Sequence, residues 1–314
     1  MSSKKIFALR DLSAFFYLLP LRMIATILPV RIVRSIGVLI AYIYSTLSAR
    51  RRRAIEKKLM VVFKDTEKIN ETEKISKQCL FNAASTYIND LILHRISKKD
   101  LLKCGKIMGL ENLENALSAQ KGVILVSGHF CGNRVAKRFL SEIGFPILSI
   151  RKKPFSNPAM SMIKRKYLQP IRFKLFNKIV QDYVFIEDDY FSLKILKRLR
   201  ENGLVDIHID ARNSSHLIEC AFLGTKRLFP ADFLRIVYLT GAPVIPMLCI
   251  GNCSSFTIIF EKSVEFHKTS NKDEFISVNL NKLVRILESQ IVHHPSQWLP
   301  MKRLSFIHNV KTPS

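Results

Sequence analysis

One histidine stands where the pattern of the chain places reactive groups. The apolar run Val123–Ser127 is followed by Gly128 and then directly by His129. A short apolar run bounded by glycines is typical of a buried parallel strand, and reactive groups in open α/β sheets lie at the carboxyl ends of strands. A histidine there can take a proton from a substrate hydroxyl that attacks an acyl carbon, and helix N-terminal N–H groups can stabilise the oxyanion. His129 is therefore the candidate general base. The alternative is a histidine with a purely structural role, whose hydrogen bonds are made within the fold.

The elements that would position His129 alternate between strands and helices. Short apolar runs typical of buried strands recur beyond residue 120, and amphipathic stretches with helical spacing separate them. We expect strands at 122–127, 146–150, 204–209, 244–250 and 256–260, and helices at 71–94, 135–143, 158–168, 190–200 and 231–239. This alternation predicts an α/β fold with a mostly parallel central sheet flanked by helices.

The N-terminal part of the chain is both apolar and basic. Its longest uncharged piece near the arginines, residues 35–49, has 15 residues, whereas a membrane-spanning helix needs about 20. The run Arg50–Arg53 follows at once, and basic clusters beside apolar helices bind anionic headgroups. We predict helices that lie in the membrane interface, including residues 12–21. The alternative for these helices is the core of a soluble domain, and the alternative for the arginine run is nucleic-acid binding. The predicted division is a membrane-anchoring part, 1–60, and an α/β domain, 61–314.

The charge of the chain is strongly positive and unevenly spread. Its 314 residues carry 50 Lys and Arg against 25 Asp and Glu, a formal net charge of +25, and 48% are hydrophobic, which excludes a disordered chain. Residues 134–178 hold twelve basic side chains and a single acid, Glu142. This predicts a polyanionic partner. We expect no nucleic-acid partner, because no RRM, KH or helix-turn-helix pattern is visible. We also expect no bound metal and no disulfides, because the six cysteines show no CxxC pair and no zinc-like spacing.

Several short blocks, in order along the chain, resemble one known family. They are residues 28–37, 50–53, Ser127–Phe130, 210–212, 222–224, 241–246 and Gln297–Trp298. With these blocks nearly the whole chain resembles the lysophospholipid acyltransferase superfamily, specifically its bacterial lipid A biosynthesis (lauroyl/myristoyl) acyltransferase branch. The resemblance implies a glycerolipid acyltransferase-like α/β fold with N-terminal membrane-associated helices, at the cytoplasmic face of the bacterial inner membrane.

The resemblance also implies the reaction. A fatty-acyl group would move from an acyl thioester, on acyl carrier protein or CoA, to a hydroxyl or amine of a lipid or lipid-like acceptor. The thioester is a co-substrate, and no other cofactor is expected. Anionic membrane lipid is the further expected partner.

The motif around His129 departs from the family pattern at its acid. In the family, the histidine is followed by four residues and then Asp or Glu, which orients the imidazole. That position holds Arg134, and if Cys131 is an insertion it holds Val135. Losing such a carboxylate costs a serine protease about 10⁴ in turnover. The amide of Asn133, the carboxylate of Asp210 after another expected strand, or Cys131 as a nucleophile could substitute. If nothing substitutes, the chain is a catalytically inactive homologue that binds lipid or carrier protein.

The remaining candidate residues follow from charge and position. The cations at 151–153 and 164–166 suit an acidic carrier protein, a phosphopantetheine phosphate or anionic lipid, although most charge runs are simply solvated. We expect His129 and Asn133 to be catalytic. The expected substrate-binding residues are Gly128, Arg134, Arg151, Lys152, Lys153, Arg165 and Asp210.

Overall fold

The fold is organised around one twisted sheet. The protein is described by a computed structural model that covers residues 20–153, 166, 169–180, 182–211 and 216–302. Its main strands are β1 (Gly105–Met108), β2 (Val123–Ser127), β3 (Ile147–Arg151), β4 (Tyr183–Phe185), β5 (Leu204–His208), β8 (Val244–Asn252) and β9 (Ser255–Phe260). They lie in the order β1-β9-β8-β2-β5-β3-β4, and all neighbours are parallel except β8 and β9. The predicted α/β fold with a mostly parallel sheet is confirmed.

The two central strands explain why the sequence folds this way. Every residue of β2 is buried, and so are the first four residues of β5. Their Val, Ile and Leu side chains fill both faces, as expected for parallel strands covered by helices. The register places Ser127 beside His208, so the two strands end together.

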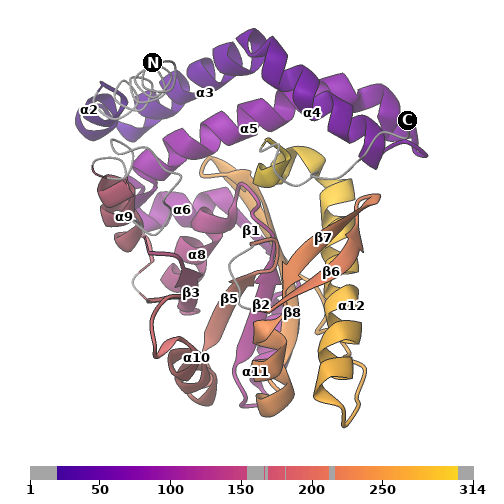
Figure 1. Cartoon of the computed structure of the whole chain (residues 1–314). Helices are drawn as coiled ribbons and strands as arrows, with labels where there is room; N and C mark the ends of the chain where they lie inside the picture. Colours follow the sequence, from indigo (N-terminus) through magenta and orange to yellow (C-terminus); the bar gives the residue numbers. More distant parts are fainter. Residues whose placement is uncertain (1–19, 154–165, 167–168, 181, 212–215, 303–314) are drawn as a thin grey trace.

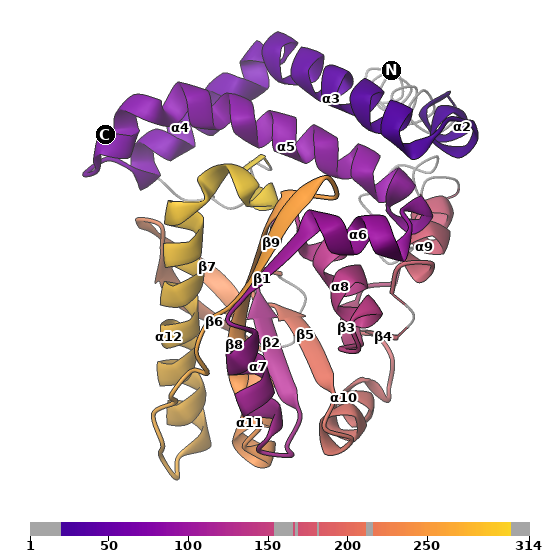
Figure 2. The ribbon, with the colours of Figure 1, turned by 180° about the vertical axis from the view of Figure 1, so that it is seen from behind.

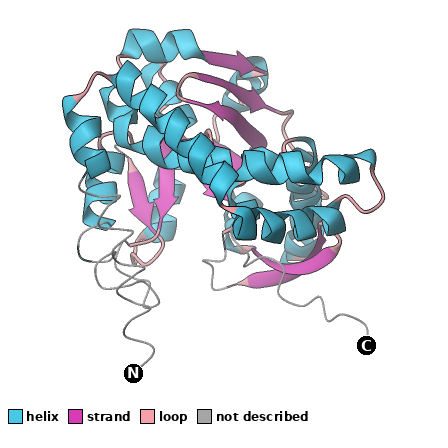
Figure 3. Ribbon diagram, turned by 90° about the horizontal axis from the view of Figure 1, so that it is seen from above, coloured by secondary structure: helices cyan, strands magenta, loops and turns pink. Residues whose placement is uncertain are grey.

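Helices cover the sheet and one of its ends (Figures 1 and 2). They are α2 (Pro20–Ile27), α3 (Val30–Leu47), α4 (Ala49–Val62), α5 (Thr72–Ile92), α6 (Lys98–Cys104), α7 (Leu110–Leu117), α8 (Asn133–Glu142), α9 (Gln169–Asn177), α10 (Phe191–Arg200), α11 (Asp232–Thr240) and α12 (Lys272–His293). α3, α4 and α5 lie across one end of the sheet, and Figure 3 views this layer from above. α10 and α11, which lead into β5 and β8, lie at the opposite end, so the helical layer covers the carboxyl ends of these strands.

The expected elements agree with those observed within a few residues, with some additions. β1, β4 and the hairpin of β6 (Leu217–Phe222) and β7 (Thr225–Pro230) were not expected from the sequence. The helix expected at 158–168 lies outside the described residues except for residue 166, and the apolar stretch 12–21 lies almost wholly outside them.

α3 packs on α5 through a stripe of mostly small residues. Val33, Gly37, Ala41 and Ser45 recur every four residues and are the buried residues of α3. A Cβ at Gly37 would lie 2.7 Å from Cγ2 of Ile88, so glycine allows the close approach of the two helices. Within the described residues, α3 is also the helix that is long and apolar enough to cross a membrane, with 18 residues and a mean hydropathy of 1.4. The division of the chain near residue 60 stays a prediction.

Candidate active site

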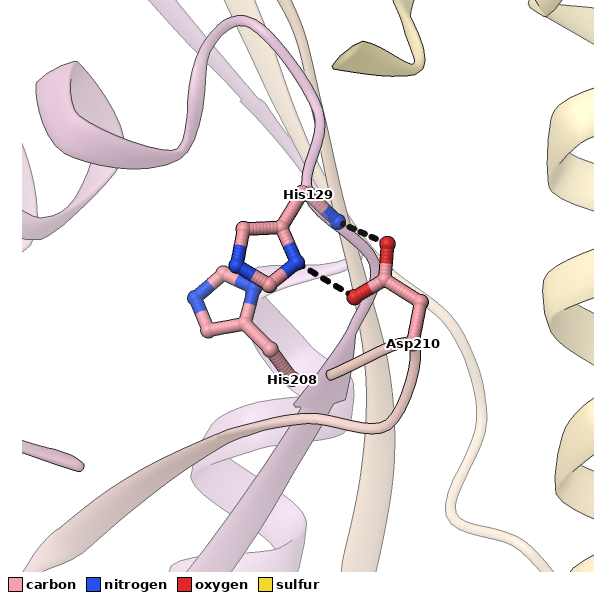
Figure 4. A group of neighbouring side chains, drawn as sticks. All are labelled: His129, His208 and Asp210. Carbon is pink, nitrogen blue, oxygen red and sulfur yellow. Dashed lines mark hydrogen bonds and ion pairs between the residues drawn. The ribbon is translucent and has the colours of Figure 1, made fainter. Parts of the chain in front are cut away.

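β2 and β5 bring His129 and Asp210 together. Ser127 pairs with His208 in the parallel register, and His129 and Asp210 each follow two residues later. The Nδ1 atom of His129 lies 2.5 Å from Oδ1 of Asp210, and the backbone N–H of His129 donates to Oδ2 at 2.8 Å (Figure 4). A carboxylate therefore reaches His129 from the loop that follows the neighbouring strand, β5.

This contact indicates which ring nitrogen of His129 carries the proton. Nδ1 faces the carboxylate, so the hydrogen-bond network assigns the ring proton to Nδ1 and leaves Nε2 as the acceptor. The side chain of His129 is 46% exposed, whereas that of Asp210 is 0% exposed. An outward imidazole backed by a buried carboxylate is the arrangement of a general base and its orienting acid.

Asp210 is held by several donors. Its Oδ2 also accepts a hydrogen bond from Nε1 of Trp298 at 2.8 Å, and its backbone carbonyl accepts one from Nη2 of Arg227 at 2.6 Å. Burial pushes the pKa of Asp210 upward, but the neighbouring His129 ring and its hydrogen bonds outweigh burial and hold the pKa well below its usual value. Asp210 is therefore ionised at neutral pH.

A C-terminal segment, residues 295–302, closes against the loop that carries His129. The N–H of Cys131 donates to the carbonyl of Gln297 at 2.9 Å, and the N–H of Leu299 donates to the carbonyl of His129 at 2.9 Å. Trp298, between them, is 1% exposed and reaches Asp210. This segment thus holds both the backbone of His129 and the side chain of Asp210.

Gly128 is needed because neighbouring side chains lie close to its backbone. A Cβ there would lie 2.7 Å from Cδ1 of Leu287 and 3.4 Å from Nε1 of Trp298. Its backbone lies outside the left-handed region, so close packing, rather than an unusual turn, requires glycine.

A second, buried polar network lies beneath His129. The ring of His208 has its centroid 4.5 Å from that of His129, and its Nε2 lies 3.0 Å from Oδ2 of Asp206. The same Oδ2 lies 2.6 Å from Nζ of Lys137, and Oγ of Ser127 donates to Oδ1 at 3.2 Å. The side chains of Asp206 and Lys137 are 0% and 6% exposed. The network therefore contains a buried ion pair.

The charges of this network follow from burial and proximity. Burial would raise the pKa of Asp206, but His208 and Lys137 outweigh it and lower that pKa. Burial lowers the pKa of His208, and the adjacent ring of His129 lowers it further, although Asp206 opposes both effects. Asp206 and Lys137 therefore form a buried ion pair, and burial favours the neutral form of the adjacent His208 imidazole.

The side chain of Asn133 lies away from the imidazole of His129, and its catalytic role stays a prediction. Its Nδ2 donates to the carbonyl of Gly128 at 2.6 Å and points toward the buried side of the loop, near His208. The orienting contact to His129 belongs to Asp210, which the sequence had placed among substrate-binding residues. Asn133 thus holds the loop rather than the imidazole ring.

The basic residues expected to bind substrate differ in their surroundings. Arg134 forms an ion pair with Asp90 of α5, and Arg151 lies against aromatic rings. Lys153 pairs with Asp188 at 3.1 Å, and Lys152 is exposed beside it. Arg165 lies outside the described residues. Arg134 therefore has a carboxylate of its own and does not face His129 as an uncompensated charge.

The site contains atoms that could bind a metal ion, but most of these atoms already take part in hydrogen bonds. Donor atoms of His129, His208 and Asp210 lie within 4.8 Å of one another. However, the Asp210 carboxylate already accepts three N–H donors, and the ammonium of Lys137 lies 3.4 Å from Nε2 of His208. A nearby ammonium group and a carboxylate that already accepts three hydrogen bonds disfavour the binding of a metal ion.

Two cavities flank this region among the described residues. The larger, about 430 Å³, lies behind the C-terminal segment and is lined by Gln297, Gly251 and His294, among others, without His129. The smaller, about 160 Å³, contains Arg134 and Arg151.

One comparison with known proteins gave a match. The sequence profile described as "Bacterial lipid A biosynthesis acyltransferase" matches residues 2–304. A search of curated proteins returned no match to this chain.

Proposed function

Because the chain belongs to the bacterial lipid A biosynthesis acyltransferase family, we propose that it transfers a fatty-acyl group from an acyl thioester to a hydroxyl of a lipid A-like acceptor. The family implies acyltransferase activity on such substrates. The donor, the residues that act and the place in the cell are parts of the proposal.

In the proposed mechanism His129 acts as the general base. Its Nε2 takes the proton of the acceptor hydroxyl while that oxygen attacks the thioester carbonyl carbon. The tetrahedral intermediate then collapses, an oxygen ester forms, and the thiolate that leaves takes the proton back from His129. Asp210 orients the imidazole through Nδ1 and stabilises its protonated form.

The hydrogen bond between His129 and Asp210 is the observation that carries this proposal. Arg134 at the family's acid position was the argument for an inactive homologue that only binds lipid or carrier protein. Asp210 supplies a buried, ionised carboxylate at 2.5 Å from Nδ1, so the departure at Arg134 does not leave the base unsupported. The catalytic interpretation is therefore favoured over the binding one.

The donor is proposed to be an acyl thioester carried by acyl carrier protein or CoA. Both present anionic groups, and the stretch 134–178 with twelve basic residues and one acid supports either.

A direct assay tests the proposed function. Purified full-length protein in detergent is incubated with a fatty-acyl thioester of acyl carrier protein or CoA and with a bacterial lipid extract. We expect a lipid product heavier by one acyl group and an equal amount of free thiol. A His129→Gln preparation serves as the blank. Thioester hydrolysis without an acylated lipid, or equal product from the blank, would contradict the proposal.

We further propose that α2 and α3 lie in the plane of an anionic membrane surface. The buried stripe of α3 faces α5, and crossing a bilayer would require α3 to leave that helix. Apolar side chains on its other side are 45–78% exposed, and arginines at 31 and 50 are exposed near its ends. Apolar residues beside cations suit an interfacial helix. The exposed apolar residues of α2 and α3 are Met23, Ile27, Ile32, Val38, Leu39, Tyr42, Ile43 and Leu47.

Two apolar-to-acid replacements on this surface test the attachment. Leu39→Asp with Ile43→Asp is expected to reduce sedimentation with anionic vesicles at least about tenfold, because each change removes apolar contact and adds repulsion. The matched control is Leu239→Asp with Val278→Asp, on α11 and α12, where the side chains are 75% and 44% exposed. Equal loss in both variants, or no loss in either, would argue against an interfacial α3.

A further inference from the structure

His208, at the end of β5, lies directly against the imidazole of the proposed base (Figure 4). The ring centroids of His208 and His129 lie 4.5 Å apart, and the two rings are tilted by 35°. The side chain of His129 is 46% exposed, whereas that of His208 is 15% exposed. Both ring nitrogens of His208 face other protein atoms. Any effect of His208 on the reaction therefore passes through His129.

One nitrogen of His208 contacts the backbone that leads into His129. Nδ1 lies 3.2 Å from the carbonyl oxygen of Gly128. The same oxygen accepts a hydrogen bond from Nδ2 of Asn133 at 2.6 Å. Nδ1 of His208 also lies 3.4 Å from Oγ of Ser127, the last residue of β2. Because Gly128 directly precedes His129, these contacts hold the backbone from which the imidazole of the base projects.

The other nitrogen of His208 contacts the buried ion pair. Nε2 lies 3.0 Å from Oδ2 of Asp206 and 3.4 Å from Nζ of Lys137. These two charged groups lie 2.6 Å apart and are 0% and 6% exposed. Oγ of Ser127 donates to Oδ1 of Asp206, so β2, β5 and α8 all contribute to the network. His208 thus connects the loop of the base to a buried polar network, and such networks are rigid when their groups are paired.

Stability alone does not account for an ion pair at this place. The cost of desolvation offsets much of the attraction within a buried ion pair, and apolar residues in its place are often as stable or more stable. Asp206 lies among buried apolar residues of β2 and β5, in the middle of the sheet. The pair is distinguished by its contact with His208, directly beneath the base. Its location therefore indicates a role at the site.

We infer that His208 is a positioning residue, which ties the backbone before His129 to the buried ion pair. This inference rests on the proposed function, because it concerns the base of that reaction. Two histidine–aspartate contacts lie one beneath the other. The outer contact, between His129 and Asp210, handles the proton of the acceptor. The inner contact, between His208 and Asp206, keeps the outer imidazole against its carboxylate.

Kinetics on the full-length protein in detergent test this role. His208→Phe keeps a ring but removes both nitrogens, so we expect kcat to fall at least about tenfold while both KM values stay within about twofold. His208→Asn places an amide nitrogen near the position of Nδ1, where it can donate to the carbonyl of Gly128. Its kcat is expected to lie between those of His208→Phe and wild type. Wild-type kcat in both variants, or a rise in KM with kcat unchanged, would overturn the inference.

A double variant separates positioning from stability. Lys137→Met with Asp206→Leu removes the ion pair without leaving an unpaired charge, and leucine offers Nε2 of His208 no acceptor. We expect cooperative urea unfolding, which shows that this variant folds, but a kcat at least about tenfold below wild type. Wild-type kcat in this folded variant would mean that the network acts only on stability.

Nitrogen NMR gives a readout that does not depend on turnover. With the rings of the eight histidines labelled, it reports which nitrogen of each neutral imidazole carries the proton, and His129→Gln identifies the signals of the base by removing them. In wild type we expect the proton of His129 on Nδ1, and in His208→Phe a mixture of both tautomers. His267→Asn, at a side chain 55% exposed, should change neither these signals nor kcat. A mixture in wild type, or no mixture in His208→Phe, would overturn the inference.

The inference and the proposed function fail in different ways. A wild type that transfers no acyl group, with the expected change of tautomer in His208→Phe, would contradict the proposed function alone. A wild type that transfers the acyl group, with kcat and tautomer unchanged in His208→Phe and His208→Asn, would contradict this inference alone.

Discussion

Replacing His129 with glutamine is expected to lower kcat for acyl transfer by about 10⁴-fold, because glutamine cannot take the hydroxyl proton. Asp210→Asn is expected to cost nearly as much, since the amide no longer fixes the Nδ1 proton or stabilises the imidazolium. Both residues act on one proton transfer. The double variant should therefore be no slower than His129→Gln alone. Single-turnover measurement of product formation gives the three rates.

The outcome distinguishes Asp210 from other carboxylates. Asp273→Asn, at an exposed position in the first turn of α12, makes the same chemical change and is expected to keep the wild-type rate. If Asp210→Asn lowered kcat by less than about tenfold, Asp210 would not be the orienting acid. Additive losses in the double variant would show that the two side chains act in separate steps.

Trp298→Phe extends the same series by removing a donor while keeping an aromatic ring. Phenylalanine cannot donate to Oδ2 of Asp210, but it still packs beside Phe222. We expect kcat to fall by about tenfold, in line with one lost hydrogen bond to a charged group, with little change in KM. A change in KM alone would assign Trp298 to substrate binding instead of to the positioning of Asp210.

The sequence predicts only part of the contact between His129 and Asp210. Each follows an apolar run, and strands that end at one edge bring such residues near each other. Sequence alone does not show that β2 and β5 are neighbours, because β3 and β4 come between them in the chain. Closeness along the chain favoured Asn133, four residues from His129. The order of the strands instead places Asp210, 81 residues away, in contact with the ring of His129.

The β6–β7 hairpin was missed for a different physical reason. Its turn consists of Leu223 and Gly224, both with positive φ, at 49° and 74°. Glycine signals such a turn, but leucine does not, because a side chain is strained in that conformation. Long-range packing imposes the turn. For example, the N–H of Leu223 donates to Oε1 of Glu288 on α12.

The buried network was also missed, although the sequence held a sign of it. Lys137 lies on the buried side of α8, with Ala136 and Leu140, where a lysine is rare unless it is paired. The partner, Asp206, lies within β5 among apolar residues. Two opposite charges inside apolar elements indicate an ion pair, but only the fold shows that the two elements meet.

Removing the charge of Asp206 is expected to have the largest effect on stability. Asp206→Asn leaves the ammonium of Lys137 buried without its carboxylate, and breaking a buried pair from one side costs about 3–5 kcal/mol. The double variant Lys137→Met with Asp206→Asn should recover part of this loss, because no unpaired charge remains. Glu201→Gln, in the exposed pair with Lys197 on α10, should change stability by less than about 1 kcal/mol. Urea unfolding measures all four proteins.

The direction of the pH dependence gives this prediction a second check. The pKa of Asp206 is lower in the folded chain than the unfolded value of about 3.9, so its charge stabilises the fold above about pH 4 and loses that effect as pH falls below it. In a His208→Gln background, where no histidine titrates beside Asp206, the gap in unfolding free energy produced by Asp206→Asn should therefore be constant from pH 5 to 7, both well above about 3.9, and shrink in more acidic solution. A gap that widened in acid would mean that Asp206 is protonated in the folded protein. Lys137 would then have no buried counter-charge, and His208 would lose the carboxylate that favours its protonated form.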